Sequence, residues 1–279
     1  MKKGEAPIRV AVIGTCRVHH TARALEQAGH VILHNGGMDS FVHSPPEILL
    51  RLEVLLGKTS YSDELVNLQV GESPNTKLSP DVGYNLLDAD VLVIEVSSLK
   101  TVSAFGLPLQ FNEVNRHLCT PFGQFGKELM ANINHAFNKR LLSVQAPASE
   151  SPDNYPRAYL DLLQHLRVKV LSQEEIVHDL NKILSAVNLP VLLVNHINVE
   201  GSNGKLLTSR NRLCNIVRAF CNERGTALFE PASMFETMDR TRLLMDDGQD
   251  VNHYAKAELL NVGMKQLEAI QQAFDGNIS

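Results

Sequence analysis

The stretch Ile8-Arg9-Val10-Ala11-Val12-Ile13-Gly14-Thr15-Cys16-Arg17 decides the fold class of this chain. Residues 8–14 run almost without polar interruption, which is typical of a strand buried on both faces of a parallel sheet. A helix is predicted to follow over residues 18–28, because apolar residues recur there at helical spacing and Gly29 ends the pattern. Cys16 therefore stands where a buried strand leads into a helix.

The rest of the chain alternates predicted strands and helices. Further strands are expected at residues 30–33, 90–96, 189–194 and 226–229. Helices are expected at 46–56, 172–187, 208–224 and 254–273, and Ser172 with Glu175 forms a capping box at the start of the second. We therefore expect one α/β domain over residues 1–279: an open parallel sheet covered by helices on both faces, a three-layer sandwich of the SGNH or flavodoxin-like kind. Residues 101–187 are expected to form a mostly helical insertion between strands three and four.

Composition excludes several classes of protein. The formal charge of −5 and pI near 6.1 argue against a nucleic-acid partner. No apolar run approaches the ~18 residues of a membrane span, and the short stretch after Lys2 and Lys3 carries Arg9, unlike a signal peptide. The four cysteines lack zinc-ligand spacing, so no metal site is expected and free thiols in the cytoplasm are the expectation.

Two blocks at opposite ends of the chain carry the chemistry. In an open parallel sheet, ligands bind at the carboxyl ends of the strands, where Cys16 is expected. The amides of a helix N-terminus and the charge of Arg17 would favour its thiolate. Near the other end, Asp250-Val251-Asn252-His253 supplies a base and a carboxylate to orient it, which completes the groups needed for covalent acyl transfer. The alternative is that Cys16 is a small buried hydrophobic residue and Asp250 an ordinary helix cap.

Together these blocks resemble the SGNH/GDSL hydrolases. In that superfamily a first strand ends in a Gly-x-Ser nucleophile block, and an Asp-x-x-His block near the C-terminus completes the triad. Gly14-Thr15-Cys16 matches the first block with Cys in place of Ser, and Asp250 to His253 matches the last. The resemblance is closest to cysteine-bearing offshoots, the capsule-biosynthesis acetyltransferase-like (WcbI-like) proteins, and it implies an acyl-CoA donor and a triad of Cys16, His253 and Asp250.

The oxyanion hole that this resemblance implies is less complete. The second block of the superfamily contributes a glycine amide, for which Gly36 and Gly37 are candidates. The third block is Gly-x-Asn-Asp, but this chain has Ser97-Ser98-Leu99-Lys100, so the asparagine donor is absent. Ser97, Ser98 or Lys100 could replace it, because an oxyanion hole needs only a well-placed N–H or O–H.

Other polar residues are expected at the same edge of the sheet. Asn195 and His196 follow strand four; His196 could bind substrate or act as an alternative base, or it could be a core histidine. The positively charged candidates for phosphate binding are Arg17, Lys100, Arg210 and Arg212. The insertion is expected to cover the strand ends. Its candidates for lining the pocket, or for packing the insertion itself, are Phe105, Phe111, Phe122 and Phe125.

The expected function is cysteine-dependent acyl transfer to a hydroxyl or amine. The donor would be a thioester of coenzyme A or of carrier-protein pantetheine, since thiolates exchange acyl groups with little energy change, and no cofactor would be tightly bound. The partners would then be a small-molecule donor and acceptor, or an acyl carrier protein, with neither nucleic acid nor membrane. Two alternatives remain: an esterase or thioesterase with water as acceptor, and a non-catalytic acyl- or carbohydrate-binding protein.

Overall fold

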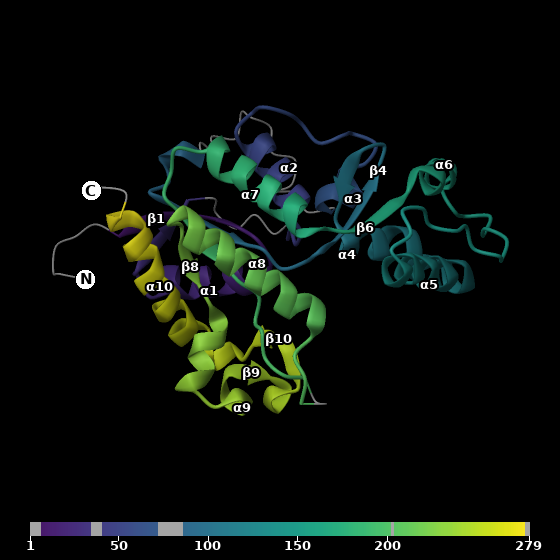
Figure 1. Cartoon of the computed structure of the whole chain (residues 1–279). Helices are drawn as coiled ribbons and strands as arrows, with labels where there is room; N and C mark the ends of the chain where they lie inside the picture. The colour runs from purple at the N-terminus through teal and green to yellow at the C-terminus, as the bar shows by residue number, and fades with distance from the viewer. Residues whose placement is uncertain (1–6, 35–40, 72–85, 202–203, 277–279) are drawn as a thin grey trace.

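A five-stranded parallel sheet lies at the centre of the computed structural model, which describes residues 7–34, 41–71, 86–201 and 204–276 (Figure 1). The strand order is β2-β1-β3-β7-β8 and every neighbouring pair is parallel. The predicted fold class is confirmed, and each predicted strand is found within two residues at either end. The strands are β1 (Ile8–Ile13), β2 (Val31–Leu33), β3 (Val91–Glu95), β7 (Val191–Val194) and β8 (Ala227–Phe229).

Helices cover both faces of this sheet. On one face lie α2 (Pro45–Leu55), α7 (Gln173–Ala186) and α8 (Thr208–Arg224); on the other lie α1 (Cys16–Gln27) and α10 (Leu259–Asp275). Because both faces are buried, the strands need apolar residues at most positions, which explains why Arg9 and Glu95 are the only charged residues in these five strands. No helix in the described parts of the chain is long and apolar enough to cross a bilayer.

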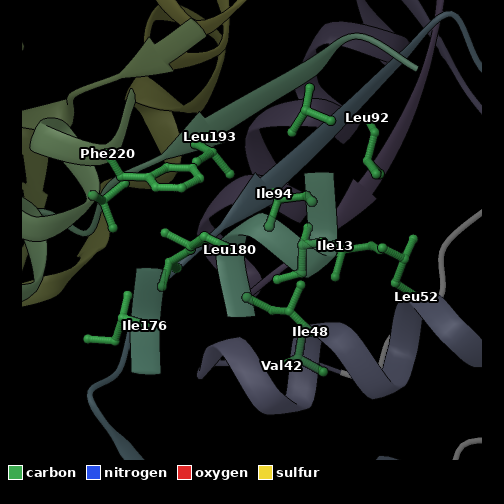
Figure 2. Close-up of a cluster of buried hydrophobic side chains, with 14 of the residues drawn as sticks. Ile13, Val42, Ile48, Leu52, Leu92, Ile94, Ile176, Leu180, Leu193 and Phe220 are labelled. Atoms are coloured by element: carbon green, nitrogen blue, oxygen red, sulfur yellow. The ribbon is translucent and has the colours of Figure 1, made fainter. Parts of the chain in front are cut away.

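Figure 2 shows the core between the sheet and the layer that contains α2, α7 and α8. Successive strand residues point to opposite layers, so alternate residues of each strand enter this core. The predicted capping box is present at the start of α7, where the Ser172 hydroxyl accepts from the Glu175 amide. Side chains drawn in this core include Ile13, Ile48, Leu52, Leu92, Ile94, Ile176, Leu180, Leu193 and Phe220.

Close packing of α10 on α1 brings the end of the chain beside its beginning. Gly263 permits the contact, because a Cβ there would lie 2.9 Å from Leu25 Cγ and 3.0 Å from Thr21 O. The buried Thr21 hydroxyl also donates to Gln266 Oε1 at 2.7 Å. The segment that precedes α10 is therefore held near the N-terminus of α1, where Cys16 lies.

That preceding segment is less helical than expected. The helix predicted over 254–273 starts at Leu259, and the Asp-x-x-His block forms strand β10, paired antiparallel with β9. In Figure 1, this hairpin and α9 gather beyond one end of the main sheet. The elements of the segment between β8 and α10 are η6 (Pro231–Glu236), α9 (Arg240–Leu243), β9 (Leu244–Met245), η7 (Asp246–Gly248), β10 (Asp250–Tyr254) and η8 (Lys256–Glu258).

Residues 101–187 contain more than the predicted helices. A three-stranded antiparallel sheet in the order β5-β4-β6 supports them and has its own apolar core, whereas α7 packs on the main sheet. The short strands escaped prediction because three to five residues give little periodicity. The elements of this region and of the segment before it are α3 (Val66–Val70), η3 (Leu86–Asp88), β4 (Lys100–Ala104), β5 (Leu107–Leu109), α4 (Phe111–Val114), a π-helical turn (Asn115–Cys119), η5 (Thr120–Phe122), α5 (Gly123–Lys139), α6 (Arg157–His165) and β6 (Arg167–Val170).

Candidate active site

A buried carboxylate lies at the carboxyl end of β3. Glu95 is 1% exposed, accepts a 3.0 Å hydrogen bond from the Thr15 amide and a second bond from the Thr15 hydroxyl, and pairs with Arg17 Nε at 2.5 Å. A Cβ at Gly14 would lie 2.7 Å from Glu95 Cβ, so only glycine lets the end of β1 approach β3 this closely. β1 and β3 flank the point where the strand order reverses, which is where open α/β sheets bind ligands.

Sequence reasoning did not identify Glu95 as a functional residue. A signal was present, because Glu95 is the one charged residue in the apolar run from Val91 to Val96. Charged residues are almost never fully buried unless they are paired, so a charge inside a central strand indicates a partner. That partner, Arg17, was predicted at the site but without this role.

Two arginines hold the backbone of β10 against the rest of the site. Arg17 Nη1 donates to Asn252 O at 3.0 Å. Arg210, in the first turn of α8, donates from Nη1 to Val251 O at 2.9 Å and from Nη2 to Asn252 Oδ1 at 2.6 Å. Two of the arginines predicted as phosphate ligands, Arg17 and Arg210, are therefore already engaged within the protein.

Within β10, Asp250 and His253 interact directly. His253 Nδ1 lies 2.6 Å from Asp250 Oδ2, and the Asn252 amide donates to Asp250 Oδ1 at 2.8 Å. Burial tends to raise the pKa of Asp250, but the hydrogen bonds from His253 and Asn252 together hold that pKa below its usual value. An ionised Asp250 accepts the Nδ1 proton of the imidazole and leaves Nε2 as the nitrogen that can take up a proton.

Cys16 and His253 line the same small pocket. Its volume is about 70 Å³ and its walls are mostly apolar. Among the described residues no hydrogen bond joins the Cys16 sulfur to the imidazole, a looseness that is common before substrate binds. The lining residues are Cys16, Arg17, His20, Met245, His253, Tyr254, Lys256 and Leu259.

The pKa of the Cys16 thiol is raised, whereas the sequence predicts an acidic thiol at this position. Burial raises the pKa of Cys16; Arg17 opposes this shift, while the charge of Glu95 adds to it. Arg17 and the amides of Arg17 and Cys16 at the helix N-terminus do lower the pKa, as the sequence predicts, but burial outweighs them and the thiol is less acidic than a free cysteine. A base must remove the thiol proton for Cys16 to act as a nucleophile.

The candidate oxyanion donors after β3 are engaged elsewhere. The amides of Ser97 and Ser98 both donate to His43 O at 2.9 Å. The Ser97 hydroxyl lies 3.3 Å from the same oxygen, and the Ser98 hydroxyl accepts from the Lys100 amide at 2.9 Å. Lys100 Nζ lies 5.0 Å from the centre of the Phe137 ring. None of these three residues lines the Cys16 pocket. Gly36 and Gly37 lie outside the described residues.

Asn195 and His196 are both buried at the end of β7. Asn195 Nδ2 donates to Cys214 O at 3.3 Å and to Glu230 Oε1 at 3.0 Å, which ties β7 to α8 and β8. His196 Nδ1 donates to Ile197 O at 2.9 Å. Burial, followed by the charges of Arg17 and Arg210, lowers the pKa of His196 well below its usual value. His196 is therefore a neutral, largely buried histidine near the two arginines, and it does not line the Cys16 pocket.

The insertion does not wall the Cys16 pocket, contrary to expectation. The described residues that line the pocket come from α1 and from the segment that runs from β9 to the first residue of α10. Three of the four phenylalanines pack the insertion itself: Phe122 and Phe125 against Tyr155, and Phe111 against Phe137. Phe105 is 57% exposed and lies beside His165.

The chain is similar in sequence to one protein family and one of its relatives, and in structure to solved esterases. The TviD N-terminal domain family matches residues 8–265. The Vi polysaccharide biosynthesis protein TviD of Salmonella typhi is 23% identical over 265 residues, which cover 91% of this chain but only 30% of that protein. Among solved structures, Axe2, an acetylxylan esterase from Geobacillus stearothermophilus, aligns over 97% of this chain and 96% of its own, with 10% identity and a TM-score of 0.41. A variant of it, described as an acetyl-xylooligosaccharide esterase, gives the same values.

Proposed function

The chain belongs to the TviD N-terminal domain family, and on that premise we propose that it is a cysteine-dependent acyltransferase. The observation that carries the proposal is that Cys16 and His253 line one pocket while Asp250 holds the far side of the imidazole. This arrangement supports Cys16 as the nucleophile, His253 as the base and Asp250 as the group that orients the base.

The reaction proceeds in two steps. His253 takes the Cys16 proton as the sulfur attacks the donor carbonyl; the donor's thiolate then leaves with that proton, and an acyl thioester remains on Cys16. In the second step His253 takes the proton of the acceptor hydroxyl or amine as it attacks this thioester. The Cys16 thiolate leaves and recovers the proton from His253, so the enzyme returns to its starting state.

A thioester is the donor that suits Cys16. A thiolate displaces another thiolate of similar basicity with little change in free energy, whereas an alkoxide is a poorer leaving group than the attacking sulfur. The donor is therefore an acyl thioester of coenzyme A or of carrier-protein pantetheine, which binds as a substrate. The name of the Salmonella relative places that protein in polysaccharide biosynthesis, so we propose a sugar hydroxyl as the acceptor class.

Intact-mass spectrometry tests the proposal. The wild-type protein is incubated with a panel of acyl-CoAs without acceptor, and it should gain one acyl mass that Cys16→Ala does not gain. Cys119→Ala is the control, because Cys119 is buried in the insertion core and burial raises its pKa to about 12. Equal labelling of the wild type and Cys16→Ala would refute the proposal.

Hydrolysis is a second candidate, favoured by the exposure of the base. The His253 side chain is 46% exposed, so water can approach it without an acceptor bound. A hydrolase would release free acid continuously from the same acyl-CoAs and accumulate no acyl mass. Adding candidate saccharides separates the two functions, because a transferase should then form an acylated saccharide in preference to free acid.

A further inference from the structure

The Glu95–Arg17 pair connects the strand at the centre of the sheet to the segment that carries His253. Arg17 uses different nitrogens for the two contacts: Nε binds Glu95 Oε1 at 2.5 Å, and Nη1 donates to Asn252 O at 3.0 Å. We propose that Glu95 is a positioning residue which, through Arg17, holds the backbone of Asn252 and so sets the His253 imidazole relative to Cys16. This inference rests on the proposed function for its catalytic meaning.

The geometry of the guanidinium supports this role. A guanidinium is a planar, rigid fork, so fixing Nε on Glu95 also fixes the direction of Nη1. Glu95 is itself held by the Thr15 amide and hydroxyl, and it belongs to a central strand with both neighbours paired. The position of Asn252, one residue before His253, is therefore fixed relative to a central strand of the main sheet.

The burial of the pair argues against a purely stabilising role. The side chains of Glu95 and Arg17 are 1% and 8% exposed, and removing two charges from water costs about as much free energy as their attraction returns. An apolar pair could join β3 to α1 equally well. It could not donate a hydrogen bond to the Asn252 carbonyl, which is the contact that reaches the base.

The same pair also affects the nucleophile. Burial is the largest cause of the raised pKa of Cys16; of the two neighbouring charges, Arg17 lowers this pKa and Glu95 raises it. Cys16 then keeps its proton until His253 removes it. Loss of Glu95 should consequently have two opposite effects, a more acidic thiol and a misplaced base.

The experiment compares Glu95→Gln, Arg17→Lys and the control Asp90→Asn. Asp90 forms the corresponding pair with Arg9 across β1 and β3, at the opposite end of the sheet. Two quantities are measured for each folded variant: the pH midpoint of Cys16 alkylation by iodoacetamide, and the rate of acyl-Cys16 formation from an acyl-CoA. A role in folding alone would not move the alkylation midpoint.

The expected results differ between the variants. Glu95→Gln should lower the alkylation midpoint by about one pH unit, since a neighbouring negative charge is removed. Its acylation rate should fall about 10²-fold, the usual cost of a catalytic group displaced by about 1 Å. Arg17→Lys keeps the charge but not the fork, so it should lose acylation to a similar extent with a near-normal midpoint. Asp90→Asn should change neither quantity.

A double-mutant comparison keeps this inference separate from the proposed function. His253→Ala should slow the alkylation of Cys16 at pH 7 in the wild-type background, because the thiol loses the base that removes its proton, and it should add little in the Arg17→Lys background. This readout needs no acyl donor, so it decides the positioning role even if the wild-type protein gains no acyl mass. If Glu95→Gln fails to fold, the positioning role is still tested by Arg17→Lys and by this double-mutant comparison. The inference would be overturned if His253→Ala slowed alkylation in the Arg17→Lys background as much as in the wild type, or if Arg17→Lys were acylated at the wild-type rate.

Discussion

Asp250 Oδ2 lies 2.6 Å from His253 Nδ1 although both residues belong to the same five-residue strand. A regular strand would place residues three apart on opposite faces and about 10 Å from each other. The register of β10 against β9 shifts between Asp250 and Tyr254, so the backbone is irregular between the two residues. The irregularity turns the carboxylate toward the imidazole, and Arg17 and Arg210 bind the carbonyls of the residues between them.

We predict that Asp250→Asn nearly abolishes acylation of Cys16. An amide in place of the carboxylate no longer fixes the Nδ1–H tautomer or stabilises the imidazolium, and loss of the equivalent group in a catalytic triad costs about 10⁴-fold in turnover. The measurement is the rate of acyl-Cys16 formation by intact mass. Asp239→Asn is the matched control, because Asp239 also accepts a hydrogen bond from the backbone, at the start of α9. A similar loss in both variants would mean that the effect is structural.

Alanine at both Ser97 and Ser98 should leave acylation within a few-fold of the wild type. The two residues hold the His43 carbonyl mainly through their backbone amides, which alanine retains. Removal of a true oxyanion donor costs about 10²–10³-fold in turnover. Single-turnover acylation of the double variant distinguishes these outcomes, and a loss in the larger range would mean that the serine hydroxyls reorient toward the substrate.

Gly14→Ala should destabilise the protein by about 1–3 kcal/mol, the usual cost of overpacking a core. The new Cβ would lie 2.7 Å from Glu95 Cβ and 2.8 Å from Val18 Cγ2, which forces β1, β3 and α1 apart. Urea unfolding measures the change. Gly29→Ala serves for comparison, because Gly29 has a positive φ of 75° but no atom within 4 Å of an added Cβ, so only backbone strain is felt there.

The parts of the fold that depend on burial were predictable from the sequence, and the parts that depend on distant partners were not. The central strands are apolar at nearly every position because helices cover both faces, and this makes them visible in the sequence. β10 shows no such apolar pattern. Its conformation depends on pairing with β9 and on two arginines that are distant in the sequence, Arg17 and Arg210. The pocket walls at Met245 and Leu259 likewise follow from how α10 packs on α1.

Met245→Ala should extend the range of acyl groups that Cys16 accepts. The pocket of about 70 Å³ is bounded by Met245, Tyr254 and Leu259, so it leaves room for only a short acyl chain. Met245 is partly exposed at the pocket wall, and its truncation removes three heavy atoms without opening the main core. The measurement is the relative acylation rate with acetyl-, butyryl- and hexanoyl-CoA. Met264→Ala is the control, since Met264 is 37% exposed on α10 and does not line the pocket. Unchanged chain-length preference in Met245→Ala would place the acyl group elsewhere.

His196 should make the protein less stable as the pH falls below about 6.5, the pKa of an unperturbed histidine. Burial holds the pKa of His196 well below that value in the folded state, so between the two pKa values the unfolded chain binds a proton that the folded chain does not. The free energy of unfolding therefore rises with pH in this window, by at most about 1.4 kcal/mol per pH unit for one group, and this stabilisation is lost as the pH drops.

His196→Asn removes the titration while its side-chain amide can still donate to Ile197 O, as Nδ1 does. Urea unfolding between pH 5 and pH 7.5 should show a shallower loss of stability for His196→Asn than for the wild type. His135→Asn, at an exposed position of α5, should follow the wild-type curve. Parallel curves for the wild type and His196→Asn would mean that His196 accepts a proton in the folded protein, as the alternative base considered from the sequence would.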